Sequence, residues 1–102
     1  MISRLWRGWT TKENAGAYEQ LLRSTILPGI HRIAGYRGAY LLRRDVPEGV
    51  EFMTITLWES MDAVRAFAGE DYEVAVVPPA ARELLLRFDA RSEHFETVAQ
   101  PG

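Results

Sequence analysis

The chain has 102 residues, of which 47% are hydrophobic and 25% are charged, a composition typical of one globular domain rather than of a disordered segment. Acidic and basic residues are interspersed and the net charge is −2 at pH 7, so the composition predicts no binding to nucleic acid or to an anionic membrane. The absence of cysteine excludes disulfides, a thiolate nucleophile and cysteine-ligated metal centres. No apolar run approaches the ~20 residues of a membrane-spanning helix. Arginines stand where a signal peptide would be apolar, so we expect a cytoplasmic protein.

The chain begins with a predicted strand followed by a predicted helix. β-Branched and aromatic residues are frequent at residues 2–9, as in a strand. Thr10 and Glu13 match a capping box, which predicts a helix with Thr10 as its N-cap. One face of this helix is apolar and consists of Ala15, Tyr18, Leu22 and Ile26. Pro28 and Gly29 predict that the helix ends or kinks nearby, because proline lacks the amide hydrogen and glycine relaxes the backbone.

Two further strands are predicted at residues 39–45 and 50–58, joined as a hairpin by the turn at residues 46–49. Alternation along the second of these strands separates its side chains into two faces. One face carries Met53, Ile55 and Leu57, and the other carries Phe52, Thr54, Thr56 and Trp58. Because neither face is fully polar, we expect both faces of the sheet to be covered.

The last third of the chain predicts a broken helical region and a final strand. Ser60 is placed to cap a helix that Gly69 ends. Residues 72–77 fit a helix and an extended chain equally well. A helix restarts at residues 78–79, and its apolar face is formed by Ala81, Leu84, Leu85 and Phe88. Residues 90–98 have the polar and aromatic pattern of a last strand.

The predicted order is βαββαβ, which indicates an α+β, ferredoxin-like fold with a four-stranded antiparallel sheet and its helices on one face. The other sheet face then needs a cover, since burying apolar surface stabilises by roughly 25 cal/mol per Å². A second copy of the chain supplies that cover, so we expect a homodimer. Residues 1–98 form a single domain in this interpretation, and residues 99–102 form a short tail.

Five segments resemble the antibiotic-biosynthesis-monooxygenase domain of the dimeric α+β barrel superfamily. They are residues 2–9, Leu27-Pro28-Gly29, Gly35-Tyr36-Arg37-Gly38, residues 50–58 and residues 60–69. The resemblance implies that two protomers pair sheet to sheet and that each keeps a pocket between its sheet and helices. Some members of this family oxidise aromatic polyketides with dioxygen and without metal or flavin, others bind and degrade haem, and many have no established activity.

The haem-degrading branch of the family has three marker residues that this sequence lacks. The branch uses an axial histidine in the second helical region, a tryptophan in the helix after the third strand, and an asparagine on the first strand. Phe67 stands at the tryptophan position, residues 72–82 contain no histidine, and residues 2–9 contain no asparagine. The resemblance therefore implies a function without haem, and we expect no cofactor. The two histidines also lack metal-ligand spacing, so no metal site is predicted.

Oxygenation without a cofactor needs a base, a dry aromatic pocket and a donor for the developing oxyanion. The predicted pocket walls and ligand contacts are Trp6, Trp58, Phe67 and Tyr72. Arg4 is predicted as the anion contact, and Arg7 points to the other face of the same strand. His94 is predicted as the catalytic base, with Glu96 on the same strand face to raise its pKa.

Each of these residues also has a structural alternative. The tryptophans fit a core or a dimer interface, and His94 fits a hydrogen-bonded surface or interface position. Two functional hypotheses follow. The first is a cofactor-independent monooxygenase that acts on a small aromatic or hydrophobic metabolite. The second is a non-catalytic module of the same fold, either a small-molecule-binding module or a dimerisation module.

Overall fold

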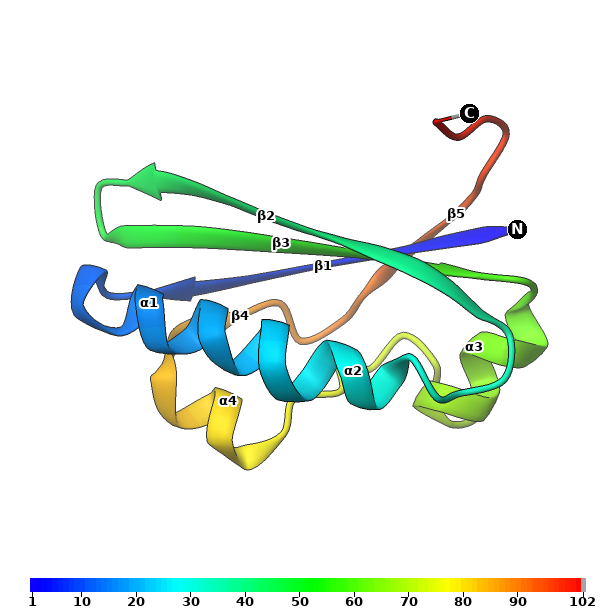
Figure 1. Cartoon of the computed structure of the whole chain (residues 1–102), viewed down its shortest axis with the longest axis horizontal. Coiled ribbons are helices and arrows are strands. Elements are labelled where there is room, and N and C mark those ends of the chain that lie inside the picture. The colour runs from blue at the N-terminus through cyan, green and yellow to red at the C-terminus, as the bar shows by residue number, and fades with distance from the viewer. Residues whose placement is uncertain (102) are drawn as a thin grey trace.

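An antiparallel sheet forms one layer of the molecule, and the helices lie against one of its faces in the computed structural model, which describes residues 1–101 (Figure 1). The strands are β1 (Ile2–Thr10), β2 (Tyr36–Val46), β3 (Gly49–Trp58), β4 (Leu85–Phe88) and β5 (Glu93–Glu96). Their order across the sheet is β2-β3-β1-β4, and β5 also pairs with β1. The predicted ferredoxin-like arrangement with helices on one face is confirmed.

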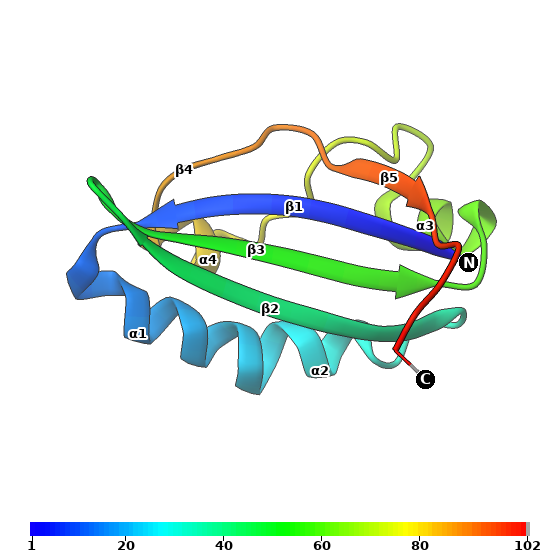
Figure 2. The ribbon, with the colours of Figure 1, turned by 90° about the horizontal axis from the view of Figure 1, so that it is seen from above.

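The fourth strand position of the sheet is shared by two short segments. β4 pairs with the end of β1, where Phe88 lies opposite Gly8, and β5 pairs with the start of β1, where His94 lies opposite Arg4. Residues 89–92 leave the sheet between them, so β4 and β5 follow one edge of β1 with an interruption (Figure 2). The prediction of a single strand at residues 90–98 was therefore wrong in its extent.

The helix that follows Pro78 is shorter than predicted, because the predicted apolar face extended to Phe88. α4 (Pro79–Leu84) ends where Leu85 takes extended dihedral angles, and Leu85 already pairs with Thr10. The backbone of residues 85–88 satisfies the open edge of β1, which a longer helix would leave unpaired. Before α4, residues 72–77 form no helix, and Val74 makes an isolated bridge with Arg91.

The first helix begins one residue later than predicted. Thr11 is the N-cap of α1 (Lys12–Leu21), and its hydroxyl accepts a hydrogen bond from the Asn14 amide at 3.1 Å. Thr10 remains in β1 opposite Val50, so its backbone is used by the sheet and cannot cap a helix. The prediction from the capping-box pattern was therefore wrong by one position.

The first helical segment continues without a break past Pro28. After α1 it widens into the π-helical turn η1 (Leu22–Ile26), where the Leu27 amide donates to the Leu22 carbonyl, and then continues as α2 (Leu27–Ile30). The changed hydrogen-bond pattern lies just before the proline, where an ordinary helix would need the missing amide. α3 (Met61–Ala68) behaves as predicted, with Ser60 as its N-cap and Gly69 at its end with φ +93°.

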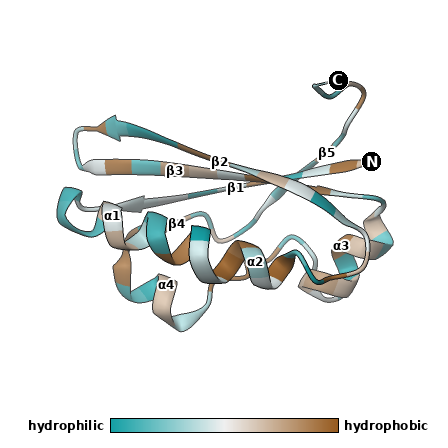
Figure 3. Ribbon diagram, in the orientation of Figure 1, coloured by the Kyte–Doolittle hydropathy of each residue, from teal (hydrophilic) through white to brown (hydrophobic). Residues whose placement is uncertain are grey.

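The core lies between the sheet and the first helix. Tyr18 packs edge-on against Phe52 with ring centroids 4.9 Å apart, and both side chains are fully buried. The opposite sheet face has no helix over it (Figure 1). On that face Tyr40 and Leu42 are 44% and 46% exposed and lie opposite Ile55 and Met53. Figure 3 shows apolar residues along β2 and β3. Because Phe52 and Trp58 are buried on the helix-covered face, the expectation that neither face is fully polar is confirmed.

Among the described residues, no helix is long and apolar enough to cross a membrane. The predicted tail at residues 99–102 includes Gly102, which lies outside the described residues.

Candidate functional site

A cavity of about 70 Å³ lies between the helix-covered face of the sheet and the helices. Its walls are mainly apolar, and its outer side is formed by the irregular segment that leads into α4, where Val76 is 48% exposed. The other apolar lining residues include Trp6, Leu22, Ile26, Phe67 and Ala81. The volume is small beside the roughly 300–1,000 Å³ of usual ligand pockets, so a ligand of several rings requires movement of this outer wall.

Strand alternation explains which side chains enter the cavity. Arg4 and Trp6 are two residues apart on β1 and point to the same face, and they lie opposite Thr56 and Thr54 of β3. All four residues line the cavity. Arg7 points to the other face, where it pairs with Glu51 at 3.7 Å and Glu93 at 3.5 Å. The predicted separation of the two arginines is confirmed.

Within the described part of the chain, Arg4 is the only arginine that lines the cavity. Arg4 is almost completely buried, with 5% of its surface exposed. Its Nη1 donates to the Tyr72 carbonyl at 2.5 Å and contacts His94 Nε2 at 2.8 Å. Its Nη2 donates to the Val74 carbonyl at 3.2 Å. The guanidinium also lies over the Phe67 ring, 5.6 Å from the centroid. These contacts fasten the segment around residues 72–74 to the sheet.

The charge of Arg4 is not balanced by a neighbouring acid. Burial lowers the pKa of Arg4 from 12.5 to about 10, so the guanidinium is still a cation at neutral pH. It forms no salt bridge with any carboxylate of residues 1–101. A buried cation without an acidic partner is costly, and carbonyl oxygens compensate only part of that cost.

His94 lies beside Arg4 instead of on the cavity wall. Its ring packs edge-on against Tyr72 with centroids 5.2 Å apart. Burial lowers its pKa below the usual 6.5, and the charge of Arg4 lowers it further, while Glu73 acts in the opposite direction. The expectation that a carboxylate would raise the pKa was therefore wrong, because burial and a cation outweigh the acid. The imidazole is neutral at pH 7, and its Nε2 accepts from Arg4.

Trp58 supports the cavity from behind. It is fully buried, its ring stacks on Phe67 at 5.0 Å, and its Nε1 donates to Thr56 Oγ1 at 2.8 Å. Phe67 therefore presents one ring face to the cavity side and the other to Trp58. Trp6 lines the cavity directly, and its Nε1 donates to the Asp89 carbonyl at 2.7 Å. That bond holds the interruption between β4 and β5 in place.

The structure thus divides the predicted site residues into two groups. Arg4, Trp6 and Phe67 line the cavity. Trp58, Tyr72 and His94 contact these residues without lining it.

Sequence reasoning missed the contributions of Ile26, Val76 and Ser92. Ser92 lies in the strand interruption and Val76 in a segment of ambiguous pattern, so no periodic signal marked either residue.

The residues that the structure describes contain no group of three histidine, aspartate or glutamate side chains that could hold a metal ion.

The sequence profile described as antibiotic biosynthesis monooxygenase matches residues 1–77. No curated protein matches the chain significantly. A mutant of SnoaB, a cofactor-independent oxygenase from Streptomyces nogalater, has 18% identity and a TM-score of 0.68, with 97% of this chain and 94% of that chain covered. The monooxygenase ActVA-Orf6 of Streptomyces coelicolor, in complex with nanaomycin D, has 14% identity and a TM-score of 0.60, with 99% and 92% covered. The haem-degrader MhuD from Mycobacterium tuberculosis, with two haems bound, has 20% identity and a TM-score of 0.62, with 100% of each chain covered.

Proposed function

This chain belongs to the antibiotic biosynthesis monooxygenase family, and from that premise we propose that it is a homodimeric, cofactor-independent monooxygenase acting on a small aromatic or hydrophobic metabolite. The observation that carries the proposal is the apolar cavity with one buried cation on its sheet side. Two similar structures, SnoaB and ActVA-Orf6, are an oxygenase and a monooxygenase by their descriptions. The alternative is a protein of the same fold that only binds its ligand.

In this proposal Trp6 and Phe67 sandwich the ring of the ligand, and Arg4 faces its oxygen. Trp58 keeps Phe67 in position, while Tyr72 and His94 keep Arg4 in position. A substrate with an activated CH₂ group beside a phenol supplies both electron pairs that dioxygen needs. One oxygen atom enters the substrate as a carbonyl, and the other leaves as water, so no external reductant is required. An apolar wall protects the reactive intermediate from water.

Haem does not fit the residues that line this cavity. Haem iron in proteins takes histidine, cysteine, methionine or tyrosine as its axial ligand. Of these types only Tyr18 lines the cavity within residues 1–101. Burial raises the pKa of Tyr18, which opposes the phenolate that iron would need. We therefore assign no haem chemistry to this site.

The proposed homodimer is supported by the sheet face that no helix covers. Tyr40, Leu42 and Phe95 are 44–52% exposed, and Met53 and Ile55 lie between them on the same face. An uncovered apolar sheet face of this kind is expected to pair with another surface. A second copy fits best, because a two-fold axis brings identical apolar patches together.

The proposed activity is tested by oxygen uptake with naphthols and polycyclic phenols, without added metal or flavin and in the presence of a chelator. Val76→Trp places a bulky ring at the outer wall of the cavity and is expected to reduce uptake at least about tenfold. Val74→Trp is the matched control, because Val74 is similarly exposed but does not line the cavity.

Equal uptake by the two variants would contradict catalysis in this cavity. Binding of these phenols without any uptake would favour the non-catalytic alternative.

A further inference from the structure

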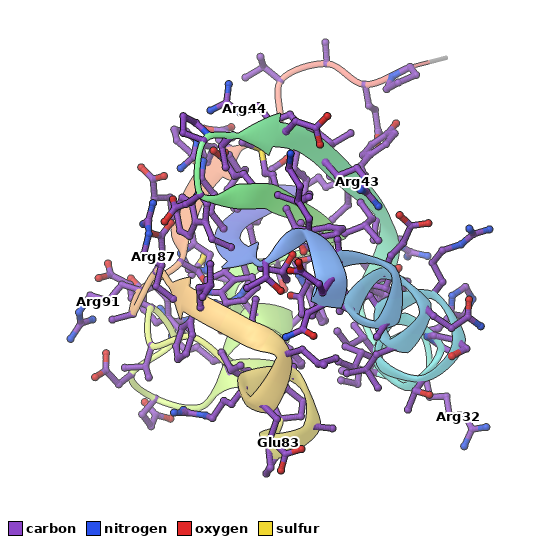
Figure 4. The ribbon with its side chains drawn as sticks, turned by 90° about the vertical axis from the view of Figure 1, so that its left-hand side faces the viewer. Arg32, Arg43, Arg44, Glu83, Arg87 and Arg91 are labelled. Atoms are coloured by element: carbon purple, nitrogen blue, oxygen red, sulfur yellow. The ribbon has the colours of Figure 1, made fainter. Side chains whose placement is uncertain are left out.

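Arg4 is exceptional among the arginines because its charge is both buried and unpaired. Arg87 and Arg91 point outward from the edge of the sheet (Figure 4) and pair with Glu48 at 2.7 Å and with Glu73 at 3.3 Å. Arg4 instead lies under the helices, and its contacts are carbonyls, an imidazole and an aromatic ring. Because all of these contacts are uncharged, the full positive charge of Arg4 beside the cavity is not neutralised.

The guanidinium of Arg4 also has donors to spare. A guanidinium has five N–H groups, and three contacts are made here, two through Nη1 and one through Nη2. The Nε–H has no acceptor among the described residues, and one Nη2 hydrogen is likewise unused. A planar cation with two free donors is suited to bind a carboxylate or another oxyanion.

The surroundings of Arg4 restrict what such an anion can be. The rest of the cavity lining is mainly apolar and includes Trp6, and the aromatic ring of Phe67 lies against the guanidinium. A free inorganic anion would leave these walls without contacts, and a neutral hydrocarbon would leave the cation unpaired. A ring that carries an oxyanion satisfies both requirements.

Resting on the proposed function, which places the ligand in this cavity, we propose that the ligand is an aromatic anion and that Arg4 determines this specificity. The anion is a carboxylate or an ionised phenol on an apolar ring. A carboxylate is already ionised at neutral pH, whereas a phenol releases its proton to solvent on binding. The buried cation favours that ionised form because opposite charges attract strongly where water is excluded.

The test compares ligands that differ in charge and hardly in shape. Benzoate and benzamide form one pair, and 4-nitrophenolate and 4-nitroaniline form the other, so that the two arms distinguish carboxylates from ionised phenols. We expect each anion to bind at least about tenfold more tightly than its neutral partner, measured by titration calorimetry. In Arg4→Met the preference is expected to fall to about onefold, whereas Arg32→Met, which removes an exposed charge (Figure 4), is expected to keep it.

A second measurement does not depend on the folding of the variant. In the unaltered protein, the NMR signal of the Arg4 Nε–H is expected to shift on addition of benzoate and to stay in place with benzamide. Equal affinity for charged and neutral ligands would overturn the inference even if oxygen uptake is observed. Absence of binding by both pairs in the millimolar range would overturn it as well. Selective anion binding without oxygen uptake would support it and contradict only the catalytic proposal.

Discussion

Arg4 and His94 face each other across the pairing of β1 and β5, and the charge of Arg4 influences the protonation of His94. The cation lowers the pKa of the imidazole, which adds to the effect of burial. A neutral imidazole can accept the hydrogen bond that Arg4 donates, whereas an imidazolium would repel it. His94 is therefore best placed to position Arg4, and it reaches a ligand proton only if Arg4 moves away.

This pair makes stability depend on pH in a definite direction. The pKa of His94 is lower in the folded protein than the usual 6.5 of the unfolded chain. As the pH falls below about 6.5, the unfolded chain therefore takes up a proton before the folded protein does. The stabilisation is thus present above pH 6.5 and is lost as the pH falls through the pKa of the folded state. His94→Gln keeps an acceptor that does not titrate, so its stability should vary less between about pH 5 and pH 8.

Urea unfolding of both proteins at several pH values measures this difference. The pH dependence of groups distant from His94 is common to the two proteins and cancels in the comparison. The same pH dependence in His94→Gln and in the unaltered protein would show that His94 is not responsible.

At the scale of single elements, Gly49 at the hairpin turn is required by the backbone, whereas Gly16 in the first helix is not. Gly49 begins β3 with φ +150°, and a Cβ there would lie 2.0 Å from the Thr10 carbonyl oxygen. Gly16 lies inside α1, is exposed, and would place a Cβ in open space. The first position requires glycine for both conformation and contact, whereas the second merely loses helix propensity.

The two glycines therefore form a matched pair of alanine substitutions. Gly49→Ala is expected to destabilise the fold by about 2–4 kcal/mol, because the backbone of β1 must move. Gly16→Ala is expected to stabilise it by about 0.5–1 kcal/mol. Thermal unfolding followed by circular dichroism compares them, and a neutral Gly49→Ala would show that the turn adapts without strain.

The segment between α3 and α4 owes its position to tertiary contacts. Its backbone is held by Arg4 at Tyr72 and Val74 and by the hydrogen bond from the Ala75 amide to the Ala90 carbonyl. Few regular hydrogen bonds and an exposed outer side make it the part of the cavity wall best able to move.

At the scale of the whole molecule, the proposed homodimer rests on the uncovered sheet face. Beside the apolar side chains of this face, toward the hairpin end of β2 and β3, the 7%-exposed Glu51 pairs with Arg44 at 3.0 Å and with Arg7 at 3.7 Å. In the proposed homodimer the apolar part would supply the driving force for pairing, and the charged part would favour one relative orientation of the two copies. The helix-covered face is already satisfied and keeps the cavity inside each protomer.

Leu42→Glu tests this assembly because Leu42 is on the uncovered face and 46% exposed, so the isolated protomer tolerates the change. The symmetric interface would bury the new charge twice, which should raise the dimer dissociation constant on the order of 100-fold. Light scattering after size-exclusion chromatography measures the mass over a range of concentrations. Ala17→Glu, on the exposed side of α1, is the control. A monomeric unaltered protein at micromolar concentration would contradict the proposed homodimer.

The sequence by itself determined the order of the elements, the two apolar faces of β3 and the opposite directions of Arg4 and Arg7, because these depend on local periodicity. It did not determine that β4 and β5 share one edge of β1, that Thr11 caps the first helix, or that the apolar stripe after Pro79 ends as a strand. Pairing with β1 decided these features, and such pairing joins residues far apart in the chain. The lowered pKa of His94 and the buried, unpaired charge of Arg4 also arise only in the folded protein, because burial and neighbours from distant segments set them.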